Sequence, residues 1–164
     1  MFDIASLENN QQGYNDPKAI YLLEKWGDLG MWLLPTATGL FSISAGYPQT
    51  YLFLSTLGLA QAVFVNRLKK TFPKQRPRPF KFGEKSNEDM KSFPSSHTAG
   101  SFLAVGLSVG FFGPSLVTIT TLALASLVGL SRFLSKKHWP ADIAAGALIG
   151  FSNGLTCAIL TKRF

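Results

Sequence analysis

Long stretches of this chain contain no charged side chain, and short polar clusters separate them. The uncharged stretches are residues 29–66, 98–131 and 143–161. A helix that crosses the hydrocarbon core of a membrane needs about 20 mostly apolar residues, so the first two stretches could each hold two helices and the third could hold one. Turn signals divide the first stretch at Gly46-Tyr47-Pro48 and the second at Gly113-Pro114. The pattern therefore predicts five membrane-spanning helices, over about 29–45, 49–68, 97–112, 115–134 and 140–161.

The residues before the first predicted span have a different pattern. Asp16-Pro17 is typical of a helix start, with a capping carboxylate followed by proline at the first helical position. Over residues 16–28 apolar side chains alternate with charged ones, which predicts a short amphipathic helix at the membrane surface. Residues 1–15 are polar, and we expect them to be loose. A chain of this length is too short for two ordinary domains, so we expect residues 1–164 to form one membrane-embedded domain.

Small residues recur along the predicted spans. Gly100, Ala104, Gly106, Gly146 and Gly150 suit close packing between membrane helices. We therefore expect an all-α fold, a polytopic membrane helical bundle of about five transmembrane helices plus a short N-terminal interfacial helix. The alternative is a soluble all-α protein with a large core, which the many Ser, Thr and Gly residues leave open.

Composition and charge restrict the partners of the protein. The formal net charge is +7, a basic balance that could indicate nucleic acid binding. However, 46% of the residues are hydrophobic and 14 are Phe, which is a poor composition for a solvated basic protein. A protein that lies in the lipid bilayer and binds anionic substrates accounts for both observations, and we expect no nucleic acid partner. The single cysteine, Cys157, excludes an intramolecular disulfide, and no sequence feature indicates an oligomeric state.

Three polar islands lie at the ends of predicted spans. They are Lys69-x6-Arg76-Pro77, Pro94-Ser95-Ser96-His97 and Ser131-Arg132-x5-His138-x3-Asp142. With five spans, the end of the second, the start of the third, the end of the fourth and the start of the fifth fall on the same membrane face. All three islands lie at those four places. The count of crossings therefore brings them together independently of their chemistry.

The first two islands and the start of the third offer groups that bind anions. Lys69, Arg76 and Arg132 could surround a phosphate, with Arg as a planar fork for two oxygens and Lys as a compact point charge. Ser95 and Ser96 precede an apolar run and predict a helix start, whose free N–H groups and partial positive charge attract phosphate. The alternative for the cations is the positive flanking of membrane helices, which is common at span ends. The joint pattern favours phosphate binding.

His138 and Asp142 are four residues apart at a predicted helix start, so their side chains share one face. The Asp142 carboxylate can accept a hydrogen bond from one imidazole nitrogen, which leaves the other nitrogen free to attack phosphorus. The only other histidine, His97, can protonate the leaving oxygen and later activate water. The alternative is a pair that only caps the helix. Fixed cations can supply the charge that magnesium supplies elsewhere, so we expect no metal and no cofactor.

The spacing within the three islands closely resembles the type 2 phosphatidic acid phosphatase superfamily, whose pattern is K-x6-RP, PSGH and SR-x5-H-x3-D. All three motifs occur in order, over residues 69–142. The resemblance implies a helical bundle, metal-independent phosphomonoesterase or diphosphatase activity, and the catalytic roles given above to His138, His97 and Asp142. This chain departs from the family in two respects: Ser96 replaces the glycine of the second motif, and membrane members commonly have six spans rather than five.

The resemblance also implies a location for the site. Membrane members usually turn it toward the periplasm or exterior, so we expect an integral protein of the bacterial inner or plasma membrane with that orientation. However, all of the sixteen Lys and Arg residues except Lys162 and Arg163 fall on the predicted site face, and the positive-inside rule then indicates the opposite orientation.

We expect residues 69–96 to form the active-site loop region. Its polar part, 79–93, could be a lid, but we expect it to be solvated.

The leading hypothesis is a membrane lipid-phosphate phosphatase whose substrate keeps its tail in the bilayer. Prenyl diphosphate, phosphatidylglycerol phosphate, phosphatidic acid and lipid A 1-phosphate all fit that description. One alternative is a lipid phosphotransferase with the same site, which passes the phosphoryl group to another lipid instead of water. Another is a non-enzymatic binder or transporter of anionic lipids, against which the intact histidines argue. Vanadium-dependent haloperoxidases have similar motifs but are soluble and much longer.

Overall fold

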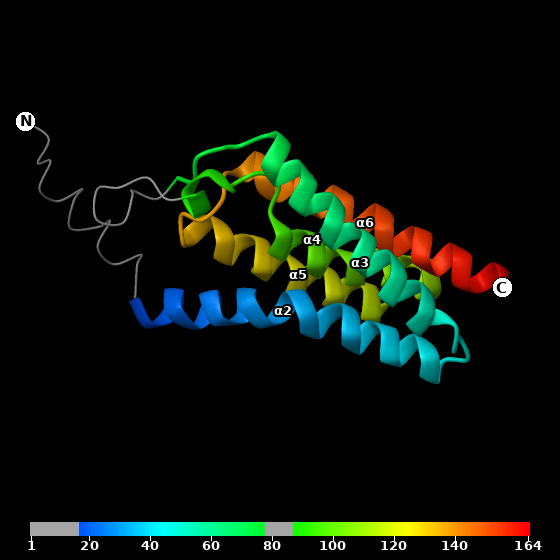
Figure 1. Ribbon diagram of the computed structural model, residues 1–164. Coiled ribbons are helices and arrows are strands. Elements are labelled where there is room, and N and C mark those ends of the chain that lie inside the picture. The colour runs from blue at the N-terminus through cyan, green and yellow to red at the C-terminus, as the bar shows by residue number, and fades with distance from the viewer. Residues whose placement is uncertain (1–16, 78–86) are drawn as a thin grey trace, which may run out of the picture.

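Five long helices make up most of the molecule (Figure 1). The computed structural model describes residues 17–77 and 87–164, so the segment 1–15 lies outside the described residues. The long helices are α2 (Pro17–Ser44), α3 (Thr50–Thr71), α4 (Ser96–Phe112), α5 (Leu116–Leu134) and α6 (Pro140–Arg163), and a short 3-10 helix, η2 (Asn87–Met90), precedes α4. Within the described ranges no strand occurs, apart from an isolated bridge between Lys74 and Lys91. The predicted all-α helical bundle is confirmed.

The last four helices agree closely with the predicted spans. α4 and α5 differ from the predicted ranges by one residue at their starts, and α6 extends two residues further at its end. α3 continues past the predicted end at residue 68 as far as Thr71, and Pro73 follows it. Pro73 and Pro114 each follow the end of a helix by two residues, where proline, which lacks the helical N–H, favours an end to α3 and α4, although α2 accommodates Pro35 in its interior.

The first helix differs from the prediction. α2 begins at Pro17, as the proline signal predicts, but it continues without a break to Ser44. Residues 16–28 therefore do not form a separate interfacial helix. Gly27 and Gly30 do not end the helix, because this half of α2 packs against α5, where Trp26 Nε1 donates to the Leu124 carbonyl oxygen at 3.2 Å. Packing on α5 keeps this half in line with the rest of α2.

α4 lies at the centre of the bundle and contacts each of the other four long helices (Figure 1). Ten of its 17 residues are buried. Its closest neighbour is α6, where Gly146, Gly150 and Gly154 present bare backbone at intervals of about one turn. A Cβ at Gly150 would lie 2.0 Å from the Ala99 carbonyl oxygen. The two backbones are therefore in direct contact, as the small residues predicted.

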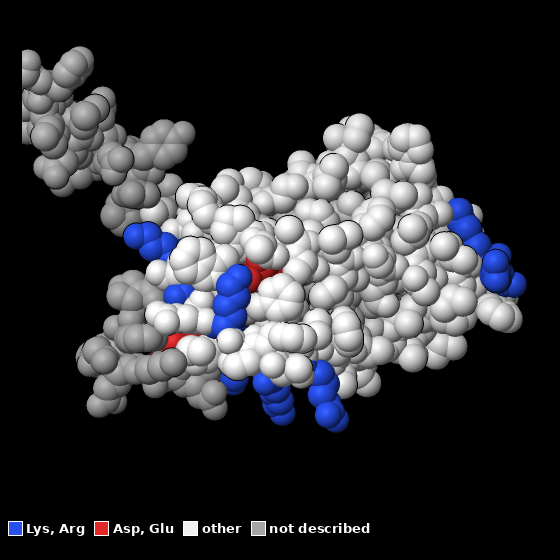
Figure 2. Space-filling model, turned by 90° about the horizontal axis from the view of Figure 1, so that it is seen from above, with Lys and Arg blue, Asp and Glu red and all other residues white. Residues whose placement is uncertain are grey.

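The lateral surface of the bundle is apolar. Large hydrophobic side chains project outward from several helices, among them Trp32, Leu116 and Leu148, whose exposed fractions are 68%, 79% and 68%. α3, α5 and α6 are long and apolar enough to cross a membrane, by length and composition, and α4 is a shorter apolar helix. Figure 2 shows Lys and Arg side chains over the left half of the molecule and at its right end, with an uncharged surface between the two groups. This is the surface of a membrane protein.

We expect Gly150→Ala to destabilise the protein, because its methyl group would take the space of the Ala99 carbonyl and force α4 and α6 apart. Overpacking of this kind costs about 1–3 kcal/mol, which should lower the thermal unfolding midpoint in detergent micelles by several degrees. Gly58→Ala is the matched control, since no atom lies within 4 Å of the place its Cβ would take. Alanine there should be neutral or stabilising. An unchanged midpoint for Gly150→Ala would contradict the backbone contact.

Candidate active site

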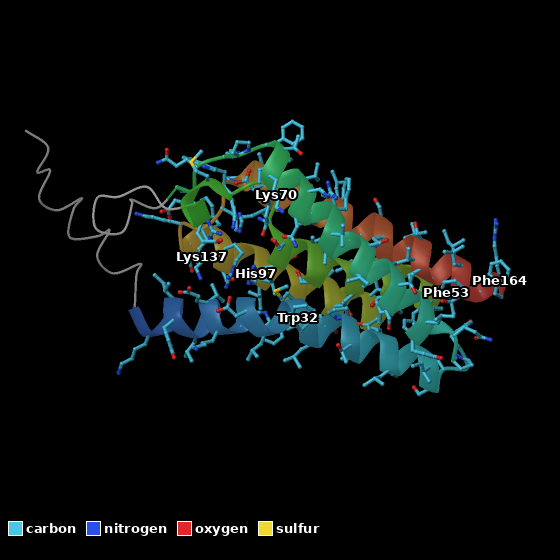
Figure 3. The ribbon with its side chains drawn as sticks, viewed as in Figure 1. Trp32, Phe53, Lys70, His97, Lys137 and Phe164 are labelled. Carbon is cyan, nitrogen blue, oxygen red and sulfur yellow. The ribbon has the colours of Figure 1, made fainter. Side chains whose placement is uncertain are left out.

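The three polar islands meet at one end of the bundle, as the count of crossings predicted. Lys69, near the end of α3, places its Nζ 2.6 Å from the Pro94 carbonyl oxygen, which joins the first island to the second. The Ser95 amide donates to the Asp142 carbonyl oxygen at 3.0 Å, which joins the second island to the third. His97 lies toward the same end (Figure 3). Residues up to 73 positions apart in the sequence thus share one site.

Main-chain carbonyl groups hold the two cations of the first island. Lys69 Nζ donates to the Lys91 carbonyl oxygen at 3.0 Å as well as to Pro94. Arg76 Nε donates to the Glu88 carbonyl oxygen at 3.0 Å. These acceptors all belong to the segment that leads into α4. Main-chain contacts with this segment therefore hold both cations at the site.

Part of the predicted solvated loop is held against the site: the expectation fails at Asp89 and Ser92, Glu88 is exposed as expected, and 78–86 lie outside the described part of the chain. Asp89 and Ser92 are buried. The Ser92 amide donates to the Lys74 carbonyl oxygen at 3.0 Å, and the Lys74 amide donates to the Met90 carbonyl oxygen at 2.8 Å. This main-chain pairing holds the segment against the site, and a solvated loop would lack it.

His138 is a buried side chain in the turn between α5 and α6. Its Nδ1 lies 2.6 Å from the Ser92 carbonyl oxygen. A carbonyl oxygen only accepts, so Nδ1 carries the hydrogen and Nε2 of the neutral ring keeps its lone pair. Burial lowers the pKa of His138 to about 3, and the positive charges of Lys69 and Arg76 act in the same direction. The ring is therefore neutral at pH 7, the state that a nucleophile requires.

Asp142 makes no direct hydrogen bond to His138, so that part of the prediction is wrong. Its carboxylate accepts from Lys74 Nζ at 2.6 Å, from Ser92 Oγ at 2.5 Å and from the Trp139 amide at 3.1 Å. The reason is its position in the first turn of α6, where the side chain turns back to cap the helix start. Asp142 reaches the ring only through Ser92, whose hydroxyl donates to the carboxylate and whose carbonyl holds Nδ1.

Arg132 is fully buried, and its guanidinium group faces α2. Nη1 donates to Asp28 Oδ1 at 2.9 Å, and Nη2 donates to the Glu24 carbonyl oxygen at 2.8 Å. Nε donates to Ser131 Oγ at 3.0 Å. The sequence predicted that this guanidinium group binds phosphate oxygens. In the structure, Nη1 and Nη2 both donate to α2.

One carboxylate of α2 bridges two islands. Asp28 Oδ1, which accepts from Arg132, also lies 3.2 Å from His97 Nε2. Glu24, one turn earlier on the same helix, forms an ion pair with Lys137. No motif indicated that α2 belongs to the site. The only available signal was that its two acidic residues, four apart, lie on one helix face.

The second island begins α4, as predicted. Ser95 is the buried N-cap residue, and its hydroxyl accepts from the Thr98 amide at 3.4 Å and from the Thr98 hydroxyl at 2.9 Å. Its hydroxyl thus serves as a cap. Ser96 is the first helical residue, and among the described residues Lys136 is the only one other than glycine with a positive φ. Serine therefore replaces the glycine of the motif without backbone strain.

Lys74 and Ser92 are site residues that sequence reasoning missed. Lys74 lies inside the six-residue gap of the first island, and Ser92 lies two residues before the second. Both contact the Asp142 carboxylate. Neither position has a spacing that separates it from an ordinary loop residue, so only the folded chain identifies them.

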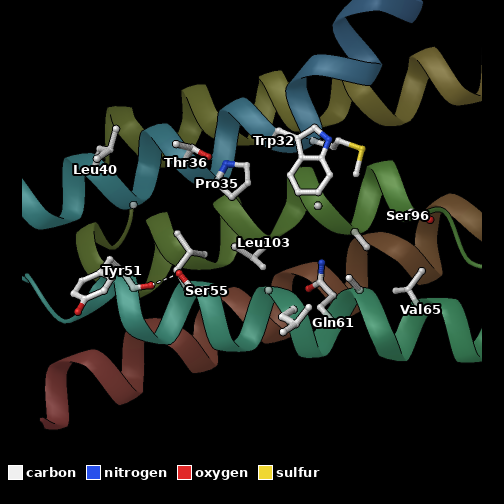
Figure 4. A pocket seen from close by; sticks show the side chains of 18 of the residues that line it. Trp32, Pro35, Thr36, Leu40, Tyr51, Ser55, Gln61, Val65, Ser96 and Leu103 are labelled. Carbon is white, nitrogen blue, oxygen red and sulfur yellow. Dashed lines mark hydrogen bonds between the residues drawn. The ribbon is translucent and has the colours of Figure 1, made fainter.

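An apolar groove of about 770 Å³ runs between α2, α3 and α4 (Figure 4). It includes Ser96 at the site and reaches Tyr51 at the start of α3. Trp32, Pro35 and Leu103 are among the side chains that line it. From Tyr51 to the end of the groove at Asn66, α3 rises about 22 Å. The groove therefore suits an apolar chain whose polar end lies at the site.

The assembled groups are those that phosphoryl transfer uses. A neutral histidine, His138, lies among cations, and a second histidine, His97, lies at the start of α4. Fixed positive charges can stabilise the oxygens of a phosphoryl group. In the part of the chain that the structure describes, no three His, Cys, Asp or Glu side chains are grouped so as to hold a metal ion.

Known proteins share parts of this sequence. The chain is 36% identical over 78 residues to probable diacylglycerol pyrophosphate phosphatase 1 of Schizosaccharomyces pombe, which covers 40% of this chain and 28% of that protein. It is 42% identical over 64 residues to bacitracin transport permease protein BcrC of Bacillus licheniformis, covering 39% and 30%. It is 32% identical over 101 residues to lipid A 1-phosphatase of Porphyromonas gingivalis, covering 60% and 21%. The matches span less than a third of each relative.

The fold has a counterpart among solved structures. The crystal structure of Aquifex aeolicus LpxE superposes with a TM-score of 0.65 over 99% of this chain and 97% of that chain, at 22% sequence identity. The family model of the PAP2 superfamily matches residues 49–164, a range that contains all three polar islands. The resemblance indicated by the spacing of the islands is therefore confirmed, and the chain belongs to the PAP2 superfamily.

Proposed function

We propose that this membrane protein hydrolyses a phosphate monoester or diphosphate on the head group of a lipid, through a phosphohistidine intermediate and without a metal ion. The observation that carries the proposal is His138, a buried neutral imidazole whose Nδ1 is held by the Ser92 carbonyl so that Nε2 is left to attack. The names of two relatives, a diacylglycerol pyrophosphate phosphatase and a lipid A 1-phosphatase, support this substrate class.

The two histidines divide the chemistry into two steps. In the first, His138 Nε2 attacks phosphorus and the bond from phosphorus to the lipid oxygen breaks. His97, which takes up a proton in the substrate complex because the phosphate charge favours its charged form, gives that proton to the lipid oxygen. In the second, water attacks phosphorus, His97 takes a proton from the water, and the bond between phosphorus and His138 breaks. Phosphate leaves, and both histidines return to their starting states.

Fixed positive charge stabilises the phosphoryl oxygens in both steps. Lys69 and Arg76 supply side-chain cations that can contact the phosphoryl group, and Arg132, whose guanidinium group is bonded to α2, adds only its positive charge. The start of α4 at Ser96 supplies the positive end of a helix, and the Ser95 amide supports it through its bond to the Asp142 carbonyl oxygen. Carbonyl groups orient Lys69 and Arg76 before substrate binds, so little reorganisation is needed when charge develops. The cations take the part that a metal ion takes in other phosphoryl-transfer sites.

Asp142 acts on His138 through Ser92. The carboxylate, itself held by Lys74, accepts from the Ser92 hydroxyl and so fixes the residue whose carbonyl orients the ring. We therefore assign Asp142 the role of a positioning residue rather than that of a direct partner of the nucleophile.

The apolar groove supports a lipid substrate. A chain that lies along α3 would leave its head group beside Ser96, at the start of α4. Prenyl diphosphate, phosphatidylglycerol phosphate, phosphatidic acid and lipid A 1-phosphate all have this form.

We place the protein in the bacterial inner or plasma membrane with its site on the periplasmic or outer face. We also treat residues 1–164 as one domain.

Detergent-purified protein should release phosphate from at least one of these four lipids with EDTA present, because its own cations stabilise the phosphoryl group. His138→Ala should reduce the rate about a thousandfold or more, since it removes the nucleophile. Rapid quenching of a turnover with ³²P-labelled lipid should trap an acid-labile, alkali-stable phosphoenzyme in the intact protein and none in the variant. A requirement for added metal, or activity retained in His138→Ala, would contradict the mechanism.

Ser92→Ala should lower kcat by about ten- to a hundredfold with little change in KM. The variant keeps the carbonyl that holds His138 but loses the hydroxyl bond to the Asp142 carboxylate, and a hydrogen bond to a charged group contributes about 1.5–3 kcal/mol. Ser101→Ala is the matched control, because that buried hydroxyl donates only to the Thr98 carbonyl within α4. The measurement is steady-state kinetics of both variants. A kcat for Ser92→Ala equal to that of Ser101→Ala would argue against a positioning role for Ser92.

Gly58→Phe should raise KM for long-chain lipid substrates about tenfold while leaving hydrolysis of p-nitrophenyl phosphate unchanged. Gly58 lines the groove and has open space at its Cβ position, so the ring would occupy the place of the lipid chain without displacing the backbone. Val63→Phe adds a ring to the same helix at an exposed position outside the groove. If both variants bind lipid as well as the intact protein, the chain lies elsewhere.

A further inference from the structure

Asp28 brings a negative charge into a site that is otherwise built to attract anions. Its Oδ1 accepts from Arg132 Nη1 at 2.9 Å and lies 3.2 Å from His97 Nε2. The side chain is 49% exposed, so the carboxylate lies at the opening of the site and not in the core. α2 is shaped to bring it there: a Cβ at Gly27 would lie 2.1 Å from Ser131 Oγ and 2.2 Å from Arg132 Nη2. A side chain at this position would force Ser131 and Arg132 to shift.

The carboxylate lies on the side where the leaving group departs. In the proposed reaction His97 protonates the leaving oxygen, which must come within hydrogen-bond distance of its ring. Because Nε2 carries a single hydrogen, the leaving oxygen either replaces Asp28 at Nε2 or bonds Nδ1, and in both cases it would lie within about 8 Å of Asp28 Oδ1. In a lipid phosphate monoester that oxygen belongs to a neutral alcohol. In a lipid diphosphate it belongs to a second phosphate, whose negative charge is repelled by the carboxylate at this distance.

The ion pair between Asp28 and Arg132 also disfavours a diphosphate. Asp28 offsets part of a buried positive charge that could otherwise balance the additional negative charge of a diphosphate. Glu24 does not act in this way, although it is the other acidic residue on this face. Its carboxylate pairs with Lys137, and only its main-chain carbonyl contacts Arg132.

We infer that Asp28 is a specificity-determining residue, which makes the site disfavour lipid diphosphates relative to lipid phosphate monoesters. The inference rests on the proposed phosphatase function. It concerns the ratio of two activities, so it can fail while the phosphatase function stands.

The test compares phosphatidic acid with diacylglycerol diphosphate, which carry the same acyl chains and differ by one phosphate. The ratio of kcat/KM for the diphosphate to kcat/KM for the monoester is measured with full-length protein in mixed micelles. Asp28→Asn should raise this ratio about tenfold, as expected for the loss of one unit charge near a half-exposed site. Asp28→Glu keeps the charge and should keep the ratio within about threefold of the original.

Glu24→Gln is the matched control, since it removes an acidic charge one turn away that touches neither His97 nor the Arg132 guanidinium group through its carboxylate. Its ratio should equal that of the intact protein. An unchanged ratio in Asp28→Asn, including an equal loss of both activities, would overturn the inference, as would an equal shift in Glu24→Gln. Failure of the intact protein to hydrolyse these two lipids and also the other lipid phosphates named above would instead refute the phosphatase function.

A second measurement needs no variant, in case Asp28→Asn does not fold. Inorganic phosphate and pyrophosphate are compared as inhibitors of the intact protein. Pyrophosphate should inhibit no better than phosphate, because its second phosphate would lie near Asp28. Inhibition by pyrophosphate that is tenfold or more stronger would overturn the inference.

Discussion

The backbone contact between α4 and α6 is the constraint on which the rest of the structure depends. Glycines at intervals of about one turn on α6 let the two helices meet with no side chain between them. The contact continues to the helix starts, where a Cβ at Gly146 would lie 2.5 Å from the Ser95 carbonyl oxygen and the Ser95 amide donates to Asp142. Both N-termini are therefore held side by side, and the second and third islands with them. A wider spacing would separate His138 from the segment that orients its ring.

That segment, residues 87–94, leads into α4 and orients the side chains of the site. Four of its main-chain carbonyl oxygens are close to side-chain nitrogens of the site: those of Glu88, Lys91, Ser92 and Pro94. Carbonyl oxygens carry no formal charge, so they can orient cations and an imidazole without neutralising the positive charge that a phosphate needs. The carboxylate of Asp142 bonds to Ser92 and Lys74, and so supports this segment without a direct hydrogen bond to His138.

α2 connects the two halves of the proposed binding site. Its first half brings Asp28 to His97 and Arg132, where the head group would react. Its second half contributes Trp32 and Pro35 to the apolar groove, where the lipid chain would lie. Because α2 is one continuous helix, the charge that faces the head group and the surface that faces the chain keep a fixed separation.

Much of this arrangement could be predicted from the chain alone. The lengths of the uncharged stretches and the prolines and glycines that end them are local properties, so α3 to α6 and the meeting of the three islands followed from them. The spacing of the islands was sufficient to identify the family.

The continuity of α2 could not be predicted from the sequence, because its first half is kept in line by packing on α5. The partners of Asp142 and His138 did not follow either. Spacing placed the two on one helix face, but their hydrogen-bond partners Lys74 and Ser92 come from 46 to 68 residues away along the chain. The positions of Lys74 and Ser92 relative to Asp142 and His138 are decided only when the helices pack. Helix packing therefore also decides which hydrogen bonds Asp142 and His138 make.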